Sequence, residues 1–124
     1  MNETMSSIVC NLLEARTIAH KHHLTTNSYA EHVALGEFYE GIGGIADTLA
    51  EESQGYLAEP LNLECEGVIV YTNNDTPIEF LEGLENDLRA SREGIPQDAT
   101  HILNTLDGAF SLISRTIYKL RFLS

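Results

Sequence analysis

Apolar side chains recur at steps of three and four along most of the chain, which is the spacing of one buried helix face. In the first such segment, residues 2–24, the stripe consists of Met5, Ile8, Leu12, Ala15 and Ala19. A polar break at residues 25–27 precedes a second segment that extends to about Gln54. Two more segments cover residues 77–93 and the stretch from about residue 96 almost to the C-terminus. The pattern predicts four amphipathic helices.

Two capping boxes mark helix starts. Ser28 and Glu31 have the spacing in which a serine hydroxyl accepts a backbone N–H and a glutamate reaches back. Thr76 and Glu79 repeat this spacing, with Pro77 at the first helical position. We expect Gly55 to end the second helix, and Gly94 with Pro96 to separate the third from the fourth.

The segment from Tyr56 to Asp75 has no helical periodicity and includes a short β-prone run, Val68–Tyr71. About 19 residues can span up to roughly 63 Å, enough to return along the second helix. Short, long and short connections therefore predict an all-α four-helix bundle, ferritin-like with a single long crossover between helices two and three. An up-down-up-down bundle with a loose middle loop is the alternative.

The second helix contains Gly36, Gly41, Gly43 and Gly44, each of which costs roughly 1 kcal/mol relative to alanine. Close approach of another backbone or a local kink is the expected compensation. Residues 41–46 match a variant of the dinucleotide-binding fingerprint, but that motif requires a strand before it. The helical pattern upstream argues against nucleotide binding and favours a closely packed helix.

A chain of 124 residues that is 43% apolar predicts one globular domain, residues 1–124. Its 19 acidic and 7 basic side chains give a formal charge of −12 without a basic cluster, so we expect no nucleic-acid partner. We find no transmembrane span or signal peptide and expect a cytoplasmic protein without membrane contact. Cys10 and Cys65 lack zinc-site spacing, so we expect two separate, small, semi-buried hydrophobic residues.

Candidate metal ligands gather at the turn between the first two helices, where four of the five histidines lie within residues 20–32. His20 and His32 would lie at the same end of two antiparallel helices, where they could share an ion. Asp47 and Glu51 are spaced i, i+4 and project from one face of the second helix. The alternative is a polar helix end beside a solvated acidic face. No catalytic nucleophile can be assigned.

The spacing of these residues resembles the ferroxidase signature of the Dps-like branch of the ferritin superfamily. By this resemblance, His20 and His32 match the two histidine ligands, and Asp47 and Glu51 match the helix-two carboxylates. Gly36 stands where the family has an acid. The basic N-terminal extension that many members of the family use to bind DNA is absent, so the resemblance does not imply DNA protection. The chain is also similar to small uncharacterised ferritin-like proteins that phages encode. The resemblance implies a site for iron, or for manganese or zinc, and a weak oxidation of iron(II) if the protein is an enzyme.

Distance determines how such a site could form. Asp47 follows His32 by fifteen residues, about 22 Å of helical rise, whereas metal–ligand bonds are about 2 Å long. A shared site therefore needs two copies that pack the second helix antiparallel, crossing near Tyr39 and Glu40. We expect a homodimer or larger homo-oligomer built on the first two helices. The alternative, from a different class, is a metal-free interaction or structural bundle that docks a protein partner.

Overall fold

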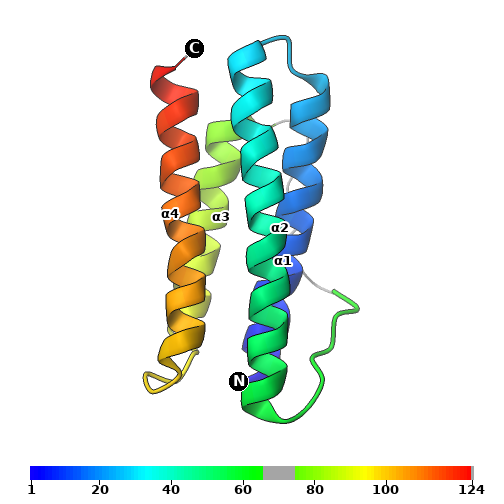
Figure 1. Ribbon diagram of the computed structural model, residues 1–124, viewed down its shortest axis with the longest axis vertical. Helices are drawn as coiled ribbons and strands as arrows, with labels where there is room; N and C mark the ends of the chain where they lie inside the picture. Colours follow the sequence, from blue (N-terminus) through cyan, green and yellow to red (C-terminus); the bar gives the residue numbers. More distant parts are fainter. Residues whose placement is uncertain (66–74, 124) are drawn as a thin grey trace.

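The computed structural model describes residues 1–65 and 75–123 of the 124-residue chain. Within these ranges the chain forms helices and no strands. The helices are α1 (Asn2–Thr25), α2 (Tyr29–Leu57), α3 (Pro77–Arg92) and α4 (Thr100–Phe122) (Figure 1). The predicted all-α fold is confirmed for these residues, while the β-prone run at 68–71 lies outside them.

The four helices lie side by side as a bundle (Figure 1). α1 packs against α2 and α3, and α4 packs against the same two helices, so α1 and α4 occupy opposite corners. Figure 1 shows α1 and α4 running in one direction and α2 and α3 in the other. α3 begins at the end of the bundle where α2 begins, and α2 finishes at the opposite end. These helix directions exclude the up-down-up-down alternative and agree with a long crossover.

At both predicted capping boxes the hydroxyl caps its helix, but the Glu31 carboxylate does not take the Ser28 N–H, which donates to Oγ1 of Thr26. The backbone N–H of Glu31 donates to Oγ of Ser28 at 3.2 Å. The backbone N–H of Glu79 donates to Oγ1 of Thr76 at 3.2 Å, and the Thr76 hydroxyl donates to the Glu79 carboxylate at 2.9 Å. These short-range signals therefore set the starts of α2 and α3.

Two predicted helix boundaries are wrong. α2 continues through Gly55 to Leu57, and its C-cap is Ala58, whose φ of 54° supplies the left-handed conformation expected of the glycine. α4 begins at Thr100, because residues 96–99 form a separate turn in which the Ala99 N–H donates to the Pro96 carbonyl at 3.0 Å. Ala99 is fully buried, so packing of this turn against the core delays the helix start.

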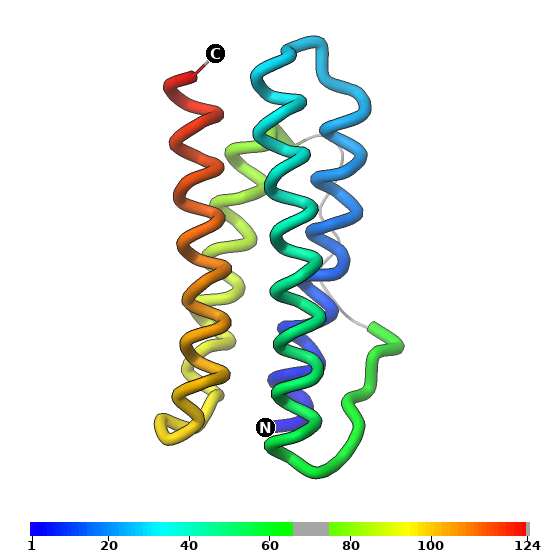
Figure 2. Tube along the Cα trace, in the orientation of Figure 1, coloured from blue at the N-terminus to red at the C-terminus, as the bar shows by residue number. Residues whose placement is uncertain are grey.

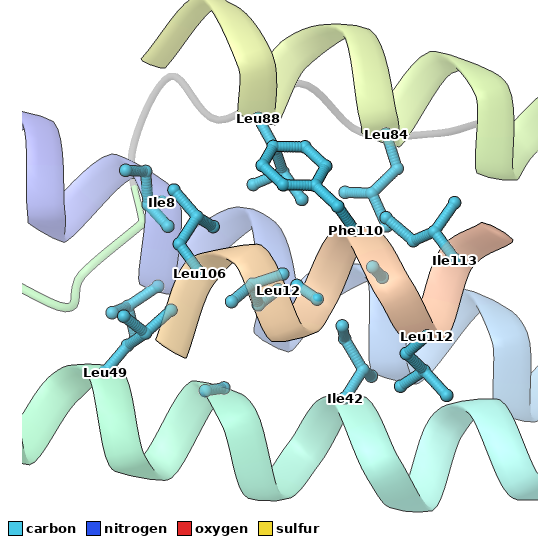
Figure 3. Packing of buried hydrophobic residues seen from close by; sticks show 14 of the residues in the cluster. Ile8, Leu12, Ile42, Leu49, Leu84, Leu88, Leu106, Phe110, Leu112 and Ile113 are labelled. Carbon is cyan, nitrogen blue, oxygen red and sulfur yellow. The ribbon is translucent and has the colours of Figure 1, made fainter. Parts of the chain in front are cut away.

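The hydrophobic core fills the space between the helices, and every helix contributes to it (Figure 3). The labelled members include Ile8 and Leu12 of α1, Ile42 and Leu49 of α2, Leu84 and Leu88 of α3, and Leu106, Phe110 and Ile113 of α4. Burial contributes roughly 1.5–3 kcal/mol for each large apolar side chain, which makes this cluster the main stabilising element. None of the described helices has the length and apolar character needed to cross a bilayer.

Where a neighbour comes close to a glycine inside α2, it is a side chain and not another backbone, which corrects the sequence expectation. A Cβ on Gly41 would lie 2.8 Å from Cδ2 of Leu112 on α4. A Cβ on Gly43 would lie 3.1 Å from Cδ of Arg16 on α1. Around Gly44 no described atom outside its own helix backbone comes within 4 Å of such a Cβ. α2 remains one continuous helix despite these residues.

Cys10 and Cys65 form a disulfide, with their Cα atoms 5.4 Å apart, so the expectation of two separate cysteines is wrong. The reason is the path of the chain after α2. Residues 59–65 follow α1 upward from its N-terminal end (Figure 2), and this brings position 65 beside position 10 across a sequence separation of 55.

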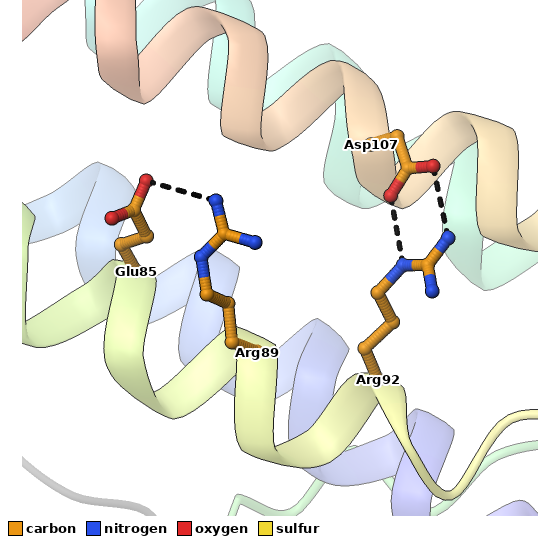
Figure 4. A network of polar contacts seen from close by, with 4 residues as sticks. All are labelled: Glu85, Arg89, Arg92 and Asp107. Carbon is orange, nitrogen blue, oxygen red and sulfur yellow. Dashed lines mark hydrogen bonds and ion pairs between the residues drawn. The ribbon is translucent and has the colours of Figure 1, made fainter.

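A polar network joins α3 to α4 on the surface (Figure 4). The guanidinium of Arg92 donates to both carboxylate oxygens of Asp107, at 2.8 and 3.0 Å. Arg89 pairs with Glu85 at 3.5 Å, and its guanidinium carbon lies 4.5 Å from the ring centre of Phe110. Exposed pairs of this kind contribute about 0–1 kcal/mol each, so they fix the register of two helices more than they stabilise the fold.

Candidate functional site

The four predicted histidines lie at one end of the bundle, where a turn at residues 26–28 joins α1 to α2 (Figure 1). α1 carries His20, His22 and His23 in its last two turns, and α2 carries His32 in its first turn. Because the two helices are antiparallel neighbours, histidines on either side of the turn come close together.

His23 and His32 form a stacked, reciprocally hydrogen-bonded pair. Their ring centres are 3.7 Å apart and the rings are inclined by 16°. Nδ1 of His23 donates to the carbonyl of His32 at 2.5 Å, and Nδ1 of His32 donates to the carbonyl of His23 at 2.7 Å. Because a carbonyl oxygen can only accept, each Nδ1 carries a hydrogen, and Nε2 of each neutral ring keeps its lone pair. The turn thus orients both rings, and within the described chain neither Nε2 makes a hydrogen bond.

Gly36 provides the space for this pair. A Cβ at position 36 would lie 3.0 Å from Cε1 and 3.2 Å from Nδ1 of His23. These distances are at the limit of what a Cβ tolerates, and the His23 ring cannot turn away without losing its hydrogen bond to His32. A side chain in place of this glycine would therefore crowd the observed position of His23.

His20 lies at the same end of the bundle as His32, as predicted, but its ring contacts Tyr39. Its ring stacks on Tyr39, with centres 4.3 Å apart, and the ring centre of His23 lies 6.1 Å away. Tyr39 lies seven residues along α2 from His32, which corresponds to about 10 Å of rise. His20 and His32 do share one end of the bundle, but the ring that pairs with His32 is that of His23.

Asp47 and Glu51 are exposed on α2, as an i, i+4 pair on one face of the helix. Because α2 is continuous, the helical rise of about 22 Å keeps Asp47 away from His32 within one chain. Among the described residues neither carboxylate makes an ion pair, and no three metal-ligating side chains come together. One chain alone therefore holds no complete metal site within residues 1–65 and 75–123.

Sequence reasoning missed the roles of His23 and Tyr39. His23 lies four residues and His32 five residues from the centre of the 26–28 turn, but His22 also lies five residues from it, so sequence spacing alone does not select the pair. His22 is directed elsewhere, with its ring centre 6.2 Å from that of Phe80 on α3. Its Nε2 is buried without a hydrogen-bond partner in the described chain.

A shallow apolar groove of about 320 Å³ lies between the start of α2 and the end of α4. Tyr29, Val33 and Leu123 are among the residues that line it. At its edge, the ammonium of Lys119 donates a hydrogen bond to Oε2 of Glu37. This hydrogen bond and the positive charge of Lys119 hold the pKa of the Glu37 carboxyl below its ordinary value. The ion pair joins α4 to α2 at the same end of the bundle as the histidines.

Comparison with protein families identifies one match. Residues 23–120, which are 98 of the 124 residues, match the family of unknown function DUF5856, so the chain belongs to that family. The matched range contains His23, His32, Asp47 and Glu51 and begins after His20. No curated protein and no solved structure matches the chain.

Proposed function

We propose that this member of the DUF5856 family binds a divalent transition metal at a site that two copies of the chain complete. The observation that supports this best is the His23–His32 pair, in which each Nδ1 donates to a backbone carbonyl. Metal-binding histidines typically have this arrangement, because a hydrogen bond from one ring nitrogen orients the other toward the ion.

The side chains near the histidine pair are of the types that bind such an ion, but one chain supplies too few of them. Imidazole nitrogen and carboxylate oxygen together suit iron, manganese and zinc. Since a third ligand is missing beside the histidine pair in the described residues, Asp47 and Glu51 of a second copy would supply the carboxylates. Both are exposed and without ion-pair partners in the described chain, so a second copy could engage them.

An antiparallel pair of α2 helices would bring these groups together. With the twofold axis near Tyr39 and Glu40, His32 of one copy lies level with Asp47 of the other. His20, which stacks on Tyr39, would lie near the axis and about 10 Å along α2 from His32. In this proposal His32 is therefore a metal ligand, and His20 lies at the edge of the site.

The same proposal includes a ferritin-like fold, with iron(II) as a substrate. The helix directions and the long connection after α2 support it (Figure 1). Each iron(II) would lose one electron to peroxide or oxygen, and the carboxylates would stabilise the more highly charged product. Gly36 removes one carboxylate from the Dps-like set, so the proposed activity is weak. We also propose that the protein is located in the cytoplasm.

Anaerobic titration with zinc(II) or iron(II) tests metal binding. We expect saturable binding of one ion per chain that is lost in His32→Ala. His101→Ala is the matched control, because His101 is exposed at the start of α4, at the opposite end of the bundle (Figure 1). Binding that is unchanged in His32→Ala, or lost equally in both variants, would contradict the proposal.

A second candidate function is a metal-free interaction bundle, which a different observation favours. Six of the eight exposed large hydrophobic residues in the described chain belong to the α1–α2 turn region or the last turns of α4. They are Leu24, Tyr29, Val33, Tyr118, Phe122 and Leu123. An exposed apolar patch typically marks a protein-binding surface. Association that a chelator leaves unchanged and Val33→Asp abolishes would favour this function over the metal site.

A further inference from the structure

The chain segment at residues 59–65 is fastened to α1 at three successive helical turns; we call it the strap. Nδ2 of Asn2 donates to the Glu59 carboxylate at 2.9 Å and to the Pro60 carbonyl at 3.1 Å. One turn further along α1, Oγ of Ser6 accepts from the Asn62 N–H at 3.1 Å. After one more turn, Cys10 holds the strap covalently. The spacing of four residues on α1 makes these anchors one continuous contact.

The three anchors differ in strength. Hydrogen bonds such as those of Asn2 and Ser6 contribute about 0.5–1.5 kcal/mol each, and the Asn2 pair is exposed. Leu61 is 9% exposed and adds apolar contact with the core. The disulfide alone is covalent, so it determines whether the upper end of the strap stays in place.

Cys65 has two properties that favour opening of the bond. Its φ is 62°, in the left-handed region that residues with a Cβ avoid. Reduction would free the backbone to leave this conformation. Cys65 is also half-buried, whereas Cys10 is 2% exposed, so a reductant reaches the disulfide from the Cys65 side.

We propose that the Cys10–Cys65 disulfide is a redox latch, which a dithiol reductant opens to release the strap from α1 while the four helices stay packed. A thiolate of the reductant attacks Sγ of Cys65, forms a mixed disulfide and displaces the Cys10 thiolate, which takes up a proton. The second thiol of the reductant then displaces Cys65. Two protein thiols and one oxidised dithiol result, so the two electrons come from the reductant.

The core explains why the helices stay packed when the latch opens. Of the strap residues only Leu61 belongs to the buried cluster, whereas all four helices contribute large, fully buried side chains. The latch closes over the N-terminal half of α1, and the histidine pair lies at the other end of that helix. The inference therefore does not rest on the proposed metal site.

Amide hydrogen exchange before and after dithiothreitol treatment tests the latch, with alkylation to count the two thiols. We expect the Asn62 amide to exchange at least about tenfold faster in the reduced protein and to lose its protection, whereas core amides of α2 stay protected and exchange faster only to the extent that the whole fold loses stability. The double variant with Cys10→Ser and Cys65→Ser should show fast exchange of the strap amides whether or not dithiothreitol is present. This control separates opening of the bond from other effects of the reagent.

Three results would overturn the inference. The first is strap exchange that stays slow although both thiols are alkylated, because the hydrogen bonds alone would then hold the strap. The second is a loss of protection throughout the helices, which would mean that the helices do not stay packed without the disulfide. The third is a disulfide that dithiothreitol does not reduce in the native protein.

Discussion

The ring of His23 occupies the space that a side chain at position 36 would need: a Cβ on Gly36 would lie 3.0 Å from Cε1 of His23. The same ring stacks on His32 and donates to its carbonyl, so it is held from both sides. The absent acid and the paired histidines are therefore one structural feature. A side chain at position 36 would have to displace the His23 ring by a few tenths of an ångström, which would disturb the observed His23–His32 pair.

Gly36→Ala should lower the free energy of unfolding by roughly 1 kcal/mol, because overpacking outweighs the higher helix propensity of alanine. Gly108→Ala is the matched control. Gly108 also lies inside a helix, and no described atom outside its own helix backbone comes within 4 Å of an added Cβ, so this variant should gain up to about 1 kcal/mol. Urea unfolding measures both.

His23→Ala should remove the penalty of Gly36→Ala in a double-mutant cycle, since it deletes the ring that the new Cβ meets. An equal cost of Gly36→Ala with and without the His23 ring would show that the two residues do not interact.

Replacing Cys10 and Cys65 by serine should lower the free energy of unfolding by roughly 2–4 kcal/mol. The bond spans 55 residues of sequence, and its loss restores conformational freedom mainly to the unfolded chain. Chemical unfolding of the oxidised wild type and the double variant measures the difference. Equal stabilities would mean that the bond restrains neither state.

Lys119→Met should raise the pKa of the Glu37 carboxyl toward its ordinary value, because the variant removes the hydrogen bond and the nearest positive charge. With a lowered folded-state pKa, the pair stabilises the fold above the unfolded-state pKa, ordinarily about 4.3 for glutamate, and this contribution is lost as pH falls through the folded-state pKa. A carbon-detected NMR titration of Glu37 measures the shift. Arg121→Met, an exposed charge further along α4, should leave it unchanged.

The Arg92–Asp107 pair should have a coupling energy of about 0.5–1 kcal/mol in a double-mutant cycle with alanine. Its geometry is bidentate, but 34% of the Arg92 side chain and 47% of the Asp107 side chain are exposed, which weakens the attraction. The coupling should fall in about 1 M salt, where screening extends over only about 3 Å. A coupling that salt does not change would mean that side-chain packing, not charge, links the two helices.

The parts of the fold that depend on local sequence could be predicted, and the parts that depend on the path of the chain could not. The starts of α2 and α3 follow from Ser28 and Thr76, whose hydroxyls cap their own helices. The helix order and the connection length indicated that a return along the bundle was possible. The Cys10–Cys65 bond depends on the strap following α1 turn by turn, and no spacing between the two residues encodes that path.

The candidate site shows the same division. The gathering of histidines at one end of the bundle follows from the antiparallel turn and was predicted. Which ring pairs with His32 depends on the rotation of α1 against α2, and that rotation brings His23 over Gly36 and His20 over Tyr39. Hydrophobic periodicity gives this angle only roughly, so the sequence did not show that the ring of His23 stacks on His32.

The most direct test of a metal site shared by two copies is the zinc stoichiometry of mixed variants. His32→Ala lacks the histidine half, and Asp47→Asn with Glu51→Gln lacks the carboxylate half, so neither should bind zinc alone. Unfolding and refolding an equal mixture forms heterodimers in which one site of the two has both halves. With random pairing, half of the dimers are heterodimers, and calorimetry should return about one zinc ion per four chains. A mixture that binds no zinc, or a His32→Ala variant that binds one ion per chain without the other variant, would contradict the shared site.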